Sequence, residues 1–297
     1  MIPGLDVGHA HCPRVRTGVT VIVPRRPAVA GVDVRGGGPG TRETDALAPD
    51  ALVERIHAVV LAGGSVFGLA AADAVALELA RQGVGLPLPD GGAVPVVPAA
   101  ILFDLRNGGD KAFLKPGGPE PPYAELARAA LAARSANPAE GPVGAGAGAT
   151  AGAQPGGVGI ARARLDGGGT VAALVVVNSF GDVTAGPPPE AGPVPMPKRP
   201  GVASLVGPAG RSATTLACVA TDVALSRAAA RRLAGMAHDG LARAIRPIHT
   251  PFDGDTVFAL SLAEPAPAAV DPVLLAELGT RAADCVARAC RRAVVQP

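Results

Sequence analysis

Apolar runs alternate with Gly- and Pro-rich stretches along the 297 residues of this chain. β-Branched residues alternate in GVTVIVP, while IHAVVL is a short continuous apolar run; both patterns are typical of strands. GTVAALVVVNSFGDV is a longer apolar segment with Asn178 near its end. The apolar pattern predicts strands at 18–24, 56–61, 169–183, 214–221 and 255–262.

Helical segments are indicated by their end signals as well as by their apolar positions. Ser65 is expected to cap a helix that follows the Gly63-Gly64 turn and ends before Gly83. Asp271 as N-cap and Pro272 at the first position predict a long final helix. Two further helices are predicted at 122–136 and at 226–245, the latter capped by Ser226 and interrupted at Gly235 and Gly240.

Three segments have no regular period. Residues 93–105 are apolar but contain Pro95 and Pro98, which predicts an edge or irregular strand. The Gly/Ala-rich stretch 141–159 is interpreted as a tightly packed turn or a plain loop, and 184–213, with eight Pro, as a mobile linker. Strands and helices do not alternate as βαβ units, so we expect an α+β fold with two sheets between helix layers, an αββα sandwich.

Composition narrows the functional classes. Hydrophobic residues make up 48% of the chain, and the net charge is only +2, from 27 basic and 25 acidic residues. This balance gives no electrostatic reason to expect nucleic acid or a membrane surface as partner. The first ten residues lack the features of a signal peptide, no run of about 18 strongly apolar residues occurs, and the four Cys form no CxxC pair. We therefore expect a cytoplasmic protein with reduced thiols.

Two polar features suggest ligand binding. Gly63-Gly64-Ser65 lies between a predicted strand and helix, as phosphate loops do, but it lacks the GxGxxG spacing and the P-loop Lys. Close packing of the backbone explains it better. A second cluster contains residue types that bind metals, without a spaced ligand motif: His238, Asp239, His249, Asp253 and Asp255. Gly254 permits a sharp turn, so Asp253 and Asp255 could point at one spot and hold a hydroxyl or an ammonium.

Thr214 lies where the Pro-rich linker meets an apolar strand. A β-branched residue at a strand start needs no further explanation. If the chain were cut before Thr214, however, the new α-amine, with a pKa of about 7.7 to 8, could act as general base for the Thr214 hydroxyl. The position is therefore either structural or the site of an N-terminal nucleophile.

A series of motifs favours the second interpretation. They are VGHA at 7–10, VDVRGGGPGTRETD at 32–45, VVLAGGSVFGLAAAD at 59–73, VPVVPAAILFDL at 94–105, VGAGAGAT at 143–150, LVVVNSFGDV at 174–183, TTLACVATDVALS at 214–226 and AHDGLARAIRPIHTPFDGDTVFAL at 237–260. In this order they span almost the whole chain. The chain resembles the N-terminal-nucleophile hydrolases that include D-/L-aminopeptidases, β-peptidyl aminopeptidases, nylon-oligomer hydrolase and a pantetheine hydrolase.

The resemblance implies a precursor that cleaves itself before a Ser or Thr and keeps both pieces together. Thr214 matches the nucleophile and new N-terminus, Asn178 matches the Asn of the oxyanion hole, and Asp253 and Asp255 match an acidic pair near the nucleophile. No metal or organic cofactor is implied. The family also implies an oligomer of processed heterodimers.

Three positions depart from the family's pattern. Ala213 stands where members with a Thr nucleophile usually have Asn; a small residue is sterically acceptable, because self-cleavage attacks the carbonyl of that residue. Ala153 or Gln154 occupies the position of a functional Lys. Pro98 replaces an acidic residue that holds a substrate's free amine, so cleavage of free-amine peptides is not carried over.

The resulting hypothesis is a self-processing amide hydrolase. One domain, 1–297, would mature into residues 1–213 and 214–297 and cleave small peptides or peptide-like amides. Two alternatives stay open at this point. One is an unprocessed, catalytically impaired homologue that acts as a binding or scaffold protein, because of Ala213 and the missing Lys. The other is a metal-dependent hydrolase built on His238, His249 and the Asp pair.

Overall fold

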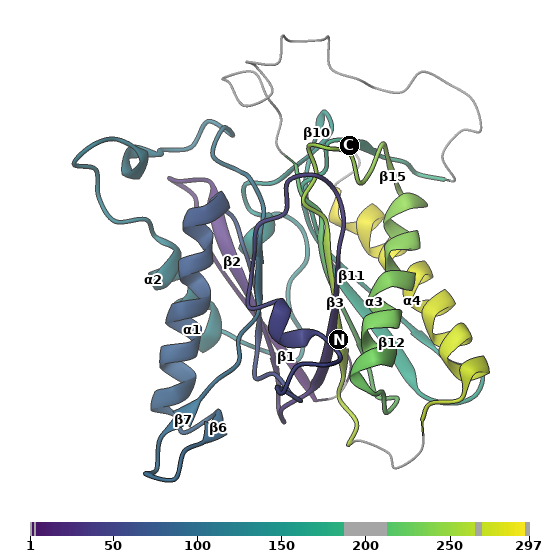
Figure 1. Cartoon of the computed structure of the whole chain (residues 1–297). Coiled ribbons are helices and arrows are strands. Elements are labelled where there is room, and N and C mark those ends of the chain that lie inside the picture. The colour runs from purple at the N-terminus through teal and green to yellow at the C-terminus, as the bar shows by residue number, and fades with distance from the viewer. Residues whose placement is uncertain (1, 3, 187–212, 265–268, 295–297) are drawn as a thin grey trace.

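Two sheets lie face to face between two layers of helices (Figure 1). The computed structural model describes residues 2, 4–186, 213–264 and 269–294. The first sheet consists of β1 (Leu5–Cys12), β2 (Thr17–Pro24), β5 (Val59–Ala62), β8 (Ala99–Ile101) and β4 (Thr41–Arg42), in that spatial order. The second consists of β11 (Gly157–Arg164), β12 (Thr170–Val177), β14 (Leu216–Thr221), β16 (Thr256–Ser261) and β3 (Val29–Val34).

The helices cover the outer faces of the two sheets. α1 (Ala70–Arg81) and α2 (Tyr123–Ala132) pack on the first sheet, and α3 (Arg227–Ala242) and α4 (Pro272–Ala293) pack on the second (Figure 1). The predicted α+β sandwich, with two sheets between helix layers, is confirmed. None of these helices, within the part of the chain that is described, combines the length and apolar character needed to cross a membrane.

Short elements connect these layers. Three two-stranded pairs occur among the described residues: β6 (Leu86–Pro87) with β7 (Ala93–Val94), β9 (Thr150–Ala151) with β10 (Gln154–Pro155), and β13 (Asp182–Val183) with β15 (Ile245–Arg246). Single 3₁₀ turns lie at η1 (Asp45–Leu47), η2 (Ser65–Leu69), η3 (Ala112–Leu114) and η4 (Gly144–Gly146).

The alternation of side chains along the strands builds the core in layers. In β12, Val175 and Val177 pack toward α3 and α4, whereas Leu174 and Val176 pack between the two sheets. Both faces of the strand are thus buried, which explains its continuous apolar run. Cys218, Cys285 and Cys290 are buried free thiols that help to fill these layers.

Two of the three predicted helix caps are present. The Ser226 hydroxyl accepts from the Ala229 amide at 3.2 Å, and the Asp271 carboxylate accepts from the Val273 amide at 2.9 Å. The prediction for Ser65 is wrong: its φ is +53°, it lies in η2, and α1 begins only at Ala70. The Gly63-Gly64 turn is held instead by close packing, with Gly64 against the Tyr123 ring.

The predicted interruption of the 226–245 helix is also wrong, because α3 continues through Gly235 and Gly240. A Cβ on Gly240 would lie 2.2 Å from the Ala283 carbonyl oxygen of α4. Gly240 therefore serves close contact between two helices rather than a break. Of the two interpretations of 93–105, the irregular segment is the one observed, since only the short strands β7 and β8 lie within it; β8 is not an edge, because it lies between β5 and β4 in the first sheet.

The Gly/Ala-rich stretch forms the packed turn that was predicted. Gly144 in η4 fits so closely that a Cβ would lie 2.3 Å from the Thr20 hydroxyl oxygen. The predicted linker is described only at its two ends. Thr184 donates its amide to the Ala244 carbonyl, and Ala213 forms an isolated bridge with Asp253, whereas 187–212 lie outside the described residues.

Candidate active site

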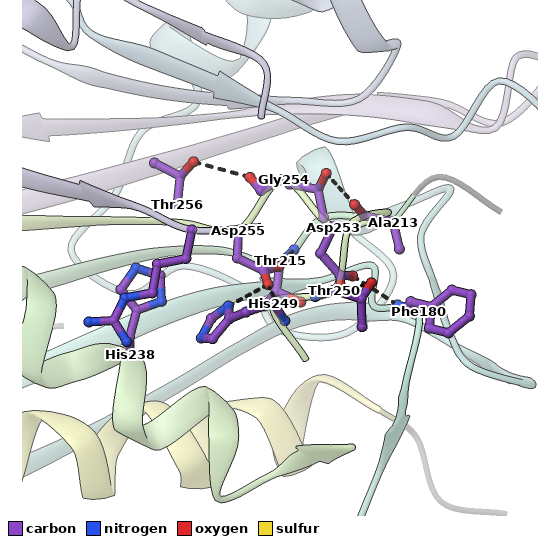
Figure 2. A network of polar contacts seen from close by, with 12 residues as sticks. Phe180, Ala213, Thr215, His238, His249, Thr250, Asp253, Gly254, Asp255 and Thr256 are labelled. Atoms are coloured by element: carbon purple, nitrogen blue, oxygen red, sulfur yellow. Dashed lines mark hydrogen bonds and ion pairs between the residues drawn. The ribbon is translucent and has the colours of Figure 1, made fainter. Parts of the chain in front are cut away.

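The register between β14 and β16 determines which residues meet at the start of β14. The two strands are parallel, with Leu216 beside Thr256, and the same offset continues to a bridge between Ala213 and Asp253. The turn Asp253-Gly254-Asp255 therefore lies alongside Ala213-Thr214-Thr215 (Figure 2). Segments some 40 positions apart in the chain are adjacent here because β14 and β16 are neighbours in the second sheet.

Hydrogen bonds hold the peptide bond between Ala213 and Thr214 on both sides. The Ala213 carbonyl oxygen accepts from the Gly254 amide at 3.1 Å, and the Ala213 amide donates to the Phe252 carbonyl at 3.1 Å. The Thr214 amide donates to the Asn178 carbonyl at 2.6 Å. The Thr214 hydroxyl lies 2.6 Å from the Ala213 carbonyl oxygen, and the side chain is only 3% exposed. The hydroxyl is thus next to the carbonyl group it would attack.

The carboxylate of Asp255 is fully buried and bonded on both oxygens. Oδ1 accepts from the Thr215 amide at 2.7 Å. Oδ2 accepts from the His249 amide at 3.1 Å and lies 2.7 Å from His249 Nδ1. Asp255 therefore holds the backbone just after Thr214 and does not bond to the Thr214 hydroxyl.

Asp253 is buried beside it and bonds to other groups. Its Oδ2 accepts from the amide and hydroxyl of Thr250 at 2.8 and 2.6 Å, and its Oδ1 accepts from the Phe180 amide at 3.4 Å (Figure 2). Burial, together with the nearby charge of Asp255, raises the pKa of Asp253. The two carboxyl groups thus bond to different segments, Asp255 to the backbone after Thr214 and Asp253 to Thr250 and Phe180.

Asn178 reaches the site by way of its backbone and presents its side chain to a cavity. The side-chain Oδ1 accepts from the Thr150 amide at 3.0 Å, and Nδ2 donates one hydrogen to the Phe103 carbonyl at 3.2 Å. The amide orientation is therefore fixed by partners on both atoms. Its second Nδ2 hydrogen has no partner among the described residues.

The other members of the predicted polar cluster do not converge as a metal site. The rings of His238 and His249 meet edge to face at 4.8 Å, and His238 Nε2 lies 3.0 Å from the Asp33 carbonyl oxygen. Burial lowers the pKa of His238 to about 4. Asp239 is exposed, and the described residues contain no group of three or more His, Cys, Asp or Glu that could hold a metal.

A cavity of about 560 Å³ lies on the side-chain side of Asn178. Ala153 and Gln154, the two candidates for the missing Lys position, are in its wall. Its polar and charged lining residues are Arg16, Asp104, Arg106, Asn107, Thr150, Gln154 and Asn178.

Four of these lining residues were not predicted from the sequence: Arg16, Asp104, Arg106 and Asn107. The last three follow β8 directly, in the segment DLRNGG, much as Asn178 follows β12. Polar residues at the end of a buried strand were thus the available signal. No such signal marks Arg16, because it lies in the turn between β1 and β2, far from the other lining residues in the sequence.

Comparison with known proteins places this geometry in a family. A model of peptidase family S58 matches residues 2–297. An uncharacterized aminopeptidase of Mycobacterium tuberculosis is 46% identical over 298 residues, covering 92% of this chain and 83% of that protein. A 6-aminohexanoate-oligomer endohydrolase of Paenarthrobacter ureafaciens is 30% identical over 291 residues, covering 88% of this chain and 74% of the relative.

Solved structures show the same fold. A Burkholderia sp. beta-aminopeptidase superposes with a TM-score of 0.74 at 23% identity, covering 98% of this chain and 84% of the other. An L-aminopeptidase D-Ala-esterase/amidase of Ochrobactrum anthropi, described as a variant of the Ntn hydrolase fold, gives a TM-score of 0.70 at 21% identity with the same coverage. The family resemblance predicted from the sequence motifs is confirmed.

Proposed function

Because this chain belongs to peptidase family S58 and is a hydrolase of peptide or amide bonds, we propose that it cleaves itself before Thr214 and uses Thr214 as nucleophile. The observation that carries the proposal is the geometry of the Ala213–Thr214 bond. Its carbonyl oxygen accepts from the Gly254 amide at 3.1 Å, and the Thr214 hydroxyl lies 2.6 Å from the same oxygen.

Self-cleavage would proceed by acyl transfer from nitrogen to oxygen. Thr214 Oγ attacks the Ala213 carbonyl carbon, and the Gly254 amide stabilises the negative charge that develops on the carbonyl oxygen. The C–N bond then breaks as the Thr214 nitrogen takes a proton, which leaves an ester. Water hydrolyses the ester to give a new carboxylate at Ala213 and a free amine at Thr214.

Substrate cleavage would use the groups that the first reaction releases. The Thr214 amine, with an ordinary pKa of about 7.7 to 8, takes the proton of the Thr214 hydroxyl as it attacks a substrate amide. The Asn178 carbonyl, which accepts from that nitrogen at 2.6 Å, would keep the amine in place. The second Nδ2 hydrogen of Asn178 would stabilise the oxyanion, and water would release the acyl group.

The acidic pair would act through the backbone around Thr214. Asp255 fixes the Thr215 amide, and Asp253 fixes the turn that carries the Gly254 amide. Their charge would also favour the ammonium form that Thr214 takes during the reaction. This assignment differs from direct orientation of the hydroxyl, which was expected from the sequence.

Both pieces would stay together after cleavage because the second sheet contains strands of each. β14 of the piece 214–297 pairs with β12 of the piece 1–213, and β16 pairs with β3. The substrates we propose are small peptides or peptide-like amides, by analogy with relatives named for aminopeptidase and 6-aminohexanoate-oligomer hydrolysis. The oligomer and the cytoplasmic location expected from the resemblance stay predictions.

Denaturing mass spectrometry tests the proposal. Purified protein should yield two masses, one for a fragment that begins at Thr214, and Thr214→Ser, which keeps a hydroxyl, should also be processed. Thr214→Ala should remain a single chain. A wild-type chain that stays intact after long incubation, with no amidase activity, would instead support the unprocessed binding or scaffold protein.

A further inference from the structure

The cavity beside Asn178 presents positive charge to a bound molecule. Among the described residues that line it, the ionisable side chains are Arg16, Asp104 and Arg106, and both arginines are exposed. Asp104 is only 3% exposed, and its oxygens accept from the Thr17 hydroxyl at 2.5 Å and the Gly64 amide at 2.8 Å. Burial raises the pKa of Asp104, and both of its oxygens already have partners in the protein.

Arg16 is held at the cavity by a specific arrangement of the backbone. It lies in the turn between β1 and β2 with a φ of +54°, where glycine would be less strained. Asn107 Nδ2 donates to the Arg16 carbonyl at 2.5 Å and to the Gly148 carbonyl at 2.9 Å, which ties the turn to the cavity wall. The Arg16 guanidinium forms no hydrogen bond or ion pair with any described residue.

Arg106 belongs to the segment that also positions Asn178. Its guanidinium lies 5.9 Å from the centre of the Phe103 ring, and the Phe103 carbonyl accepts from Asn178 Nδ2. A group bound by Arg106 would therefore lie in the same cavity as the free Nδ2 hydrogen of Asn178. Thr214 is not among the described residues that line this cavity, and Asn178, whose carbonyl accepts from the Thr214 amide at 2.6 Å, links the two.

We infer that this cavity selects amide substrates that carry a carboxylate, and that Arg16 and Arg106 bind it. The inference rests on the proposed function for the position of the reacting bond. Guanidinium groups suit this task because they bind carboxylates through paired hydrogen bonds. Asp104 is the one acidic side chain among the described lining residues, and it is buried with both oxygens bonded to Thr17 and Gly64, so the cavity offers no open carboxylate to bind an ammonium.

Paired substrates test the inference on processed protein. N-Acetylated dipeptides and ω-amino acid dimers would be compared as free acids and as the corresponding carboxamides. We expect kcat/KM to be at least about tenfold higher for the free acids, mainly through KM, and the difference to shrink as NaCl is added. Equal values for acid and carboxamide would overturn the inference.

Variants identify the residues responsible. Arg16→Gly suits the positive φ, so it should fold at least as well as the wild type while losing about tenfold of the preference for acids. Arg106→Gln should lose a similar amount, and Arg16→Lys should keep part of it. Arg14→Gln is the matched control, because Arg14 lies in the same turn but pairs with Asp110. An unchanged preference in both Arg16→Gly and Arg106→Gln would refute the assignment.

A binding measurement separates this inference from the proposed function. N-Acetyl-β-alanine and its carboxamide would be titrated into Thr214→Ala protein, which cannot react. Tighter binding of the acid, abolished by Arg16→Gly, supports the carboxylate site even if no hydrolysis is found. Equal binding of both compounds refutes the site even if the wild type is processed and active.

Discussion

Replacing Gly254 by alanine should slow self-cleavage, because it displaces the amide that bonds to the Ala213 carbonyl oxygen. A Cβ on Gly254 would lie 2.4 Å from the Gly38 carbonyl oxygen and 2.9 Å from Pro39 Cα, both backbone atoms that cannot rotate away. Reaching the 3.0 Å limit of real Cβ contacts requires a shift of about 0.6 Å (3.0 − 2.4). A shift of that size directed away from Ala213 would lengthen the present 3.1 Å between Gly254 N and Ala213 O to about 3.7 Å, beyond hydrogen-bonding distance.

The expected loss follows from the role of that amide. Removing one preorganised donor from an oxyanion site costs about 3 to 4 kcal/mol, or roughly 10² to 10³ in rate. The assay is the rate at which the two fragments appear in intact-mass spectra after purification, with thermal unfolding recorded in parallel. The variant should fold, yet process at no more than about one hundredth of the wild-type rate.

The control for this experiment lies in the loop that faces Gly254. A Cβ on Gly38 would have no neighbour closer than 3.8 Å, so Gly38→Ala alters the same contact region without a clash. It should process at the wild-type rate. If folded Gly254→Ala also processes at that rate, the Gly254 amide is not the oxyanion donor and the proposed geometry of self-cleavage is wrong.

Three further predictions concern the surroundings of the site. His249→Asn should slow self-cleavage about tenfold without unfolding the chain, because Asn tolerates the φ of +57° but lacks the ring that bonds to Asp255. Fragments that appear as fast as in the wild type would contradict this prediction. Gly240→Ala should destabilise the protein by about 1 to 3 kcal/mol in urea titrations, because the added Cβ would collide with α4. Gly235→Ala is the control, since its Cβ would have no neighbour closer than 3.5 Å, and it should be neutral or stabilising by up to about 1 kcal/mol. Burial lowers the pKa of His238 from 6.5 to about 4, so the unfolded chain takes up a proton at a higher pH than the folded protein does. The contribution of His238 to the free energy of unfolding is therefore highest above pH 6.5 and falls by about 3 kcal/mol as the pH is lowered to 4. The stability difference between wild type and His238→Gln should therefore be larger at pH 7 than at pH 4.5, and a constant difference would exclude the titration.

Local patterns predicted those parts of the fold that local chemistry decides. The apolar runs at 214–221 and 255–262 correspond to β14 and β16, and the caps Ser226 and Asp271 begin α3 and α4. The failures have a common cause in packing between distant segments. Gly240 was interpreted as a break in a helix, but only the position of α4 shows that it is needed for contact.

The candidate site was predictable in its residues but not in its connections. Thr214, Asn178, Asp253 and Asp255 do lie close together, which depends on the parallel pairing of β14 and β16. A sequence cannot show that Asn178 meets Thr214 through its carbonyl, since register and backbone direction decide that contact. The position of Arg16 at the cavity was not predicted for the same reason, because a turn residue meets its neighbours from other segments only in the folded protein.

Ala213 stands where relatives with a Thr nucleophile usually have Asn, but its side chain contributes little to the geometry of the Ala213–Thr214 bond. Backbone atoms of Gly254 and Asn178 bond to the peptide link that it shares with Thr214, and the Phe252 carbonyl accepts from the Ala213 amide just before it. The direction of the carbonyl and its distance from the Thr214 hydroxyl therefore depend on the register of the second sheet and not on the side chain before the cut. Since Ala213 is only 4% exposed, a small residue fits this buried position. For the proposed self-cleavage we therefore expect the turn 253–255 to matter more, because its glycine places an amide where charge would develop and its carboxylates hold the turn in place.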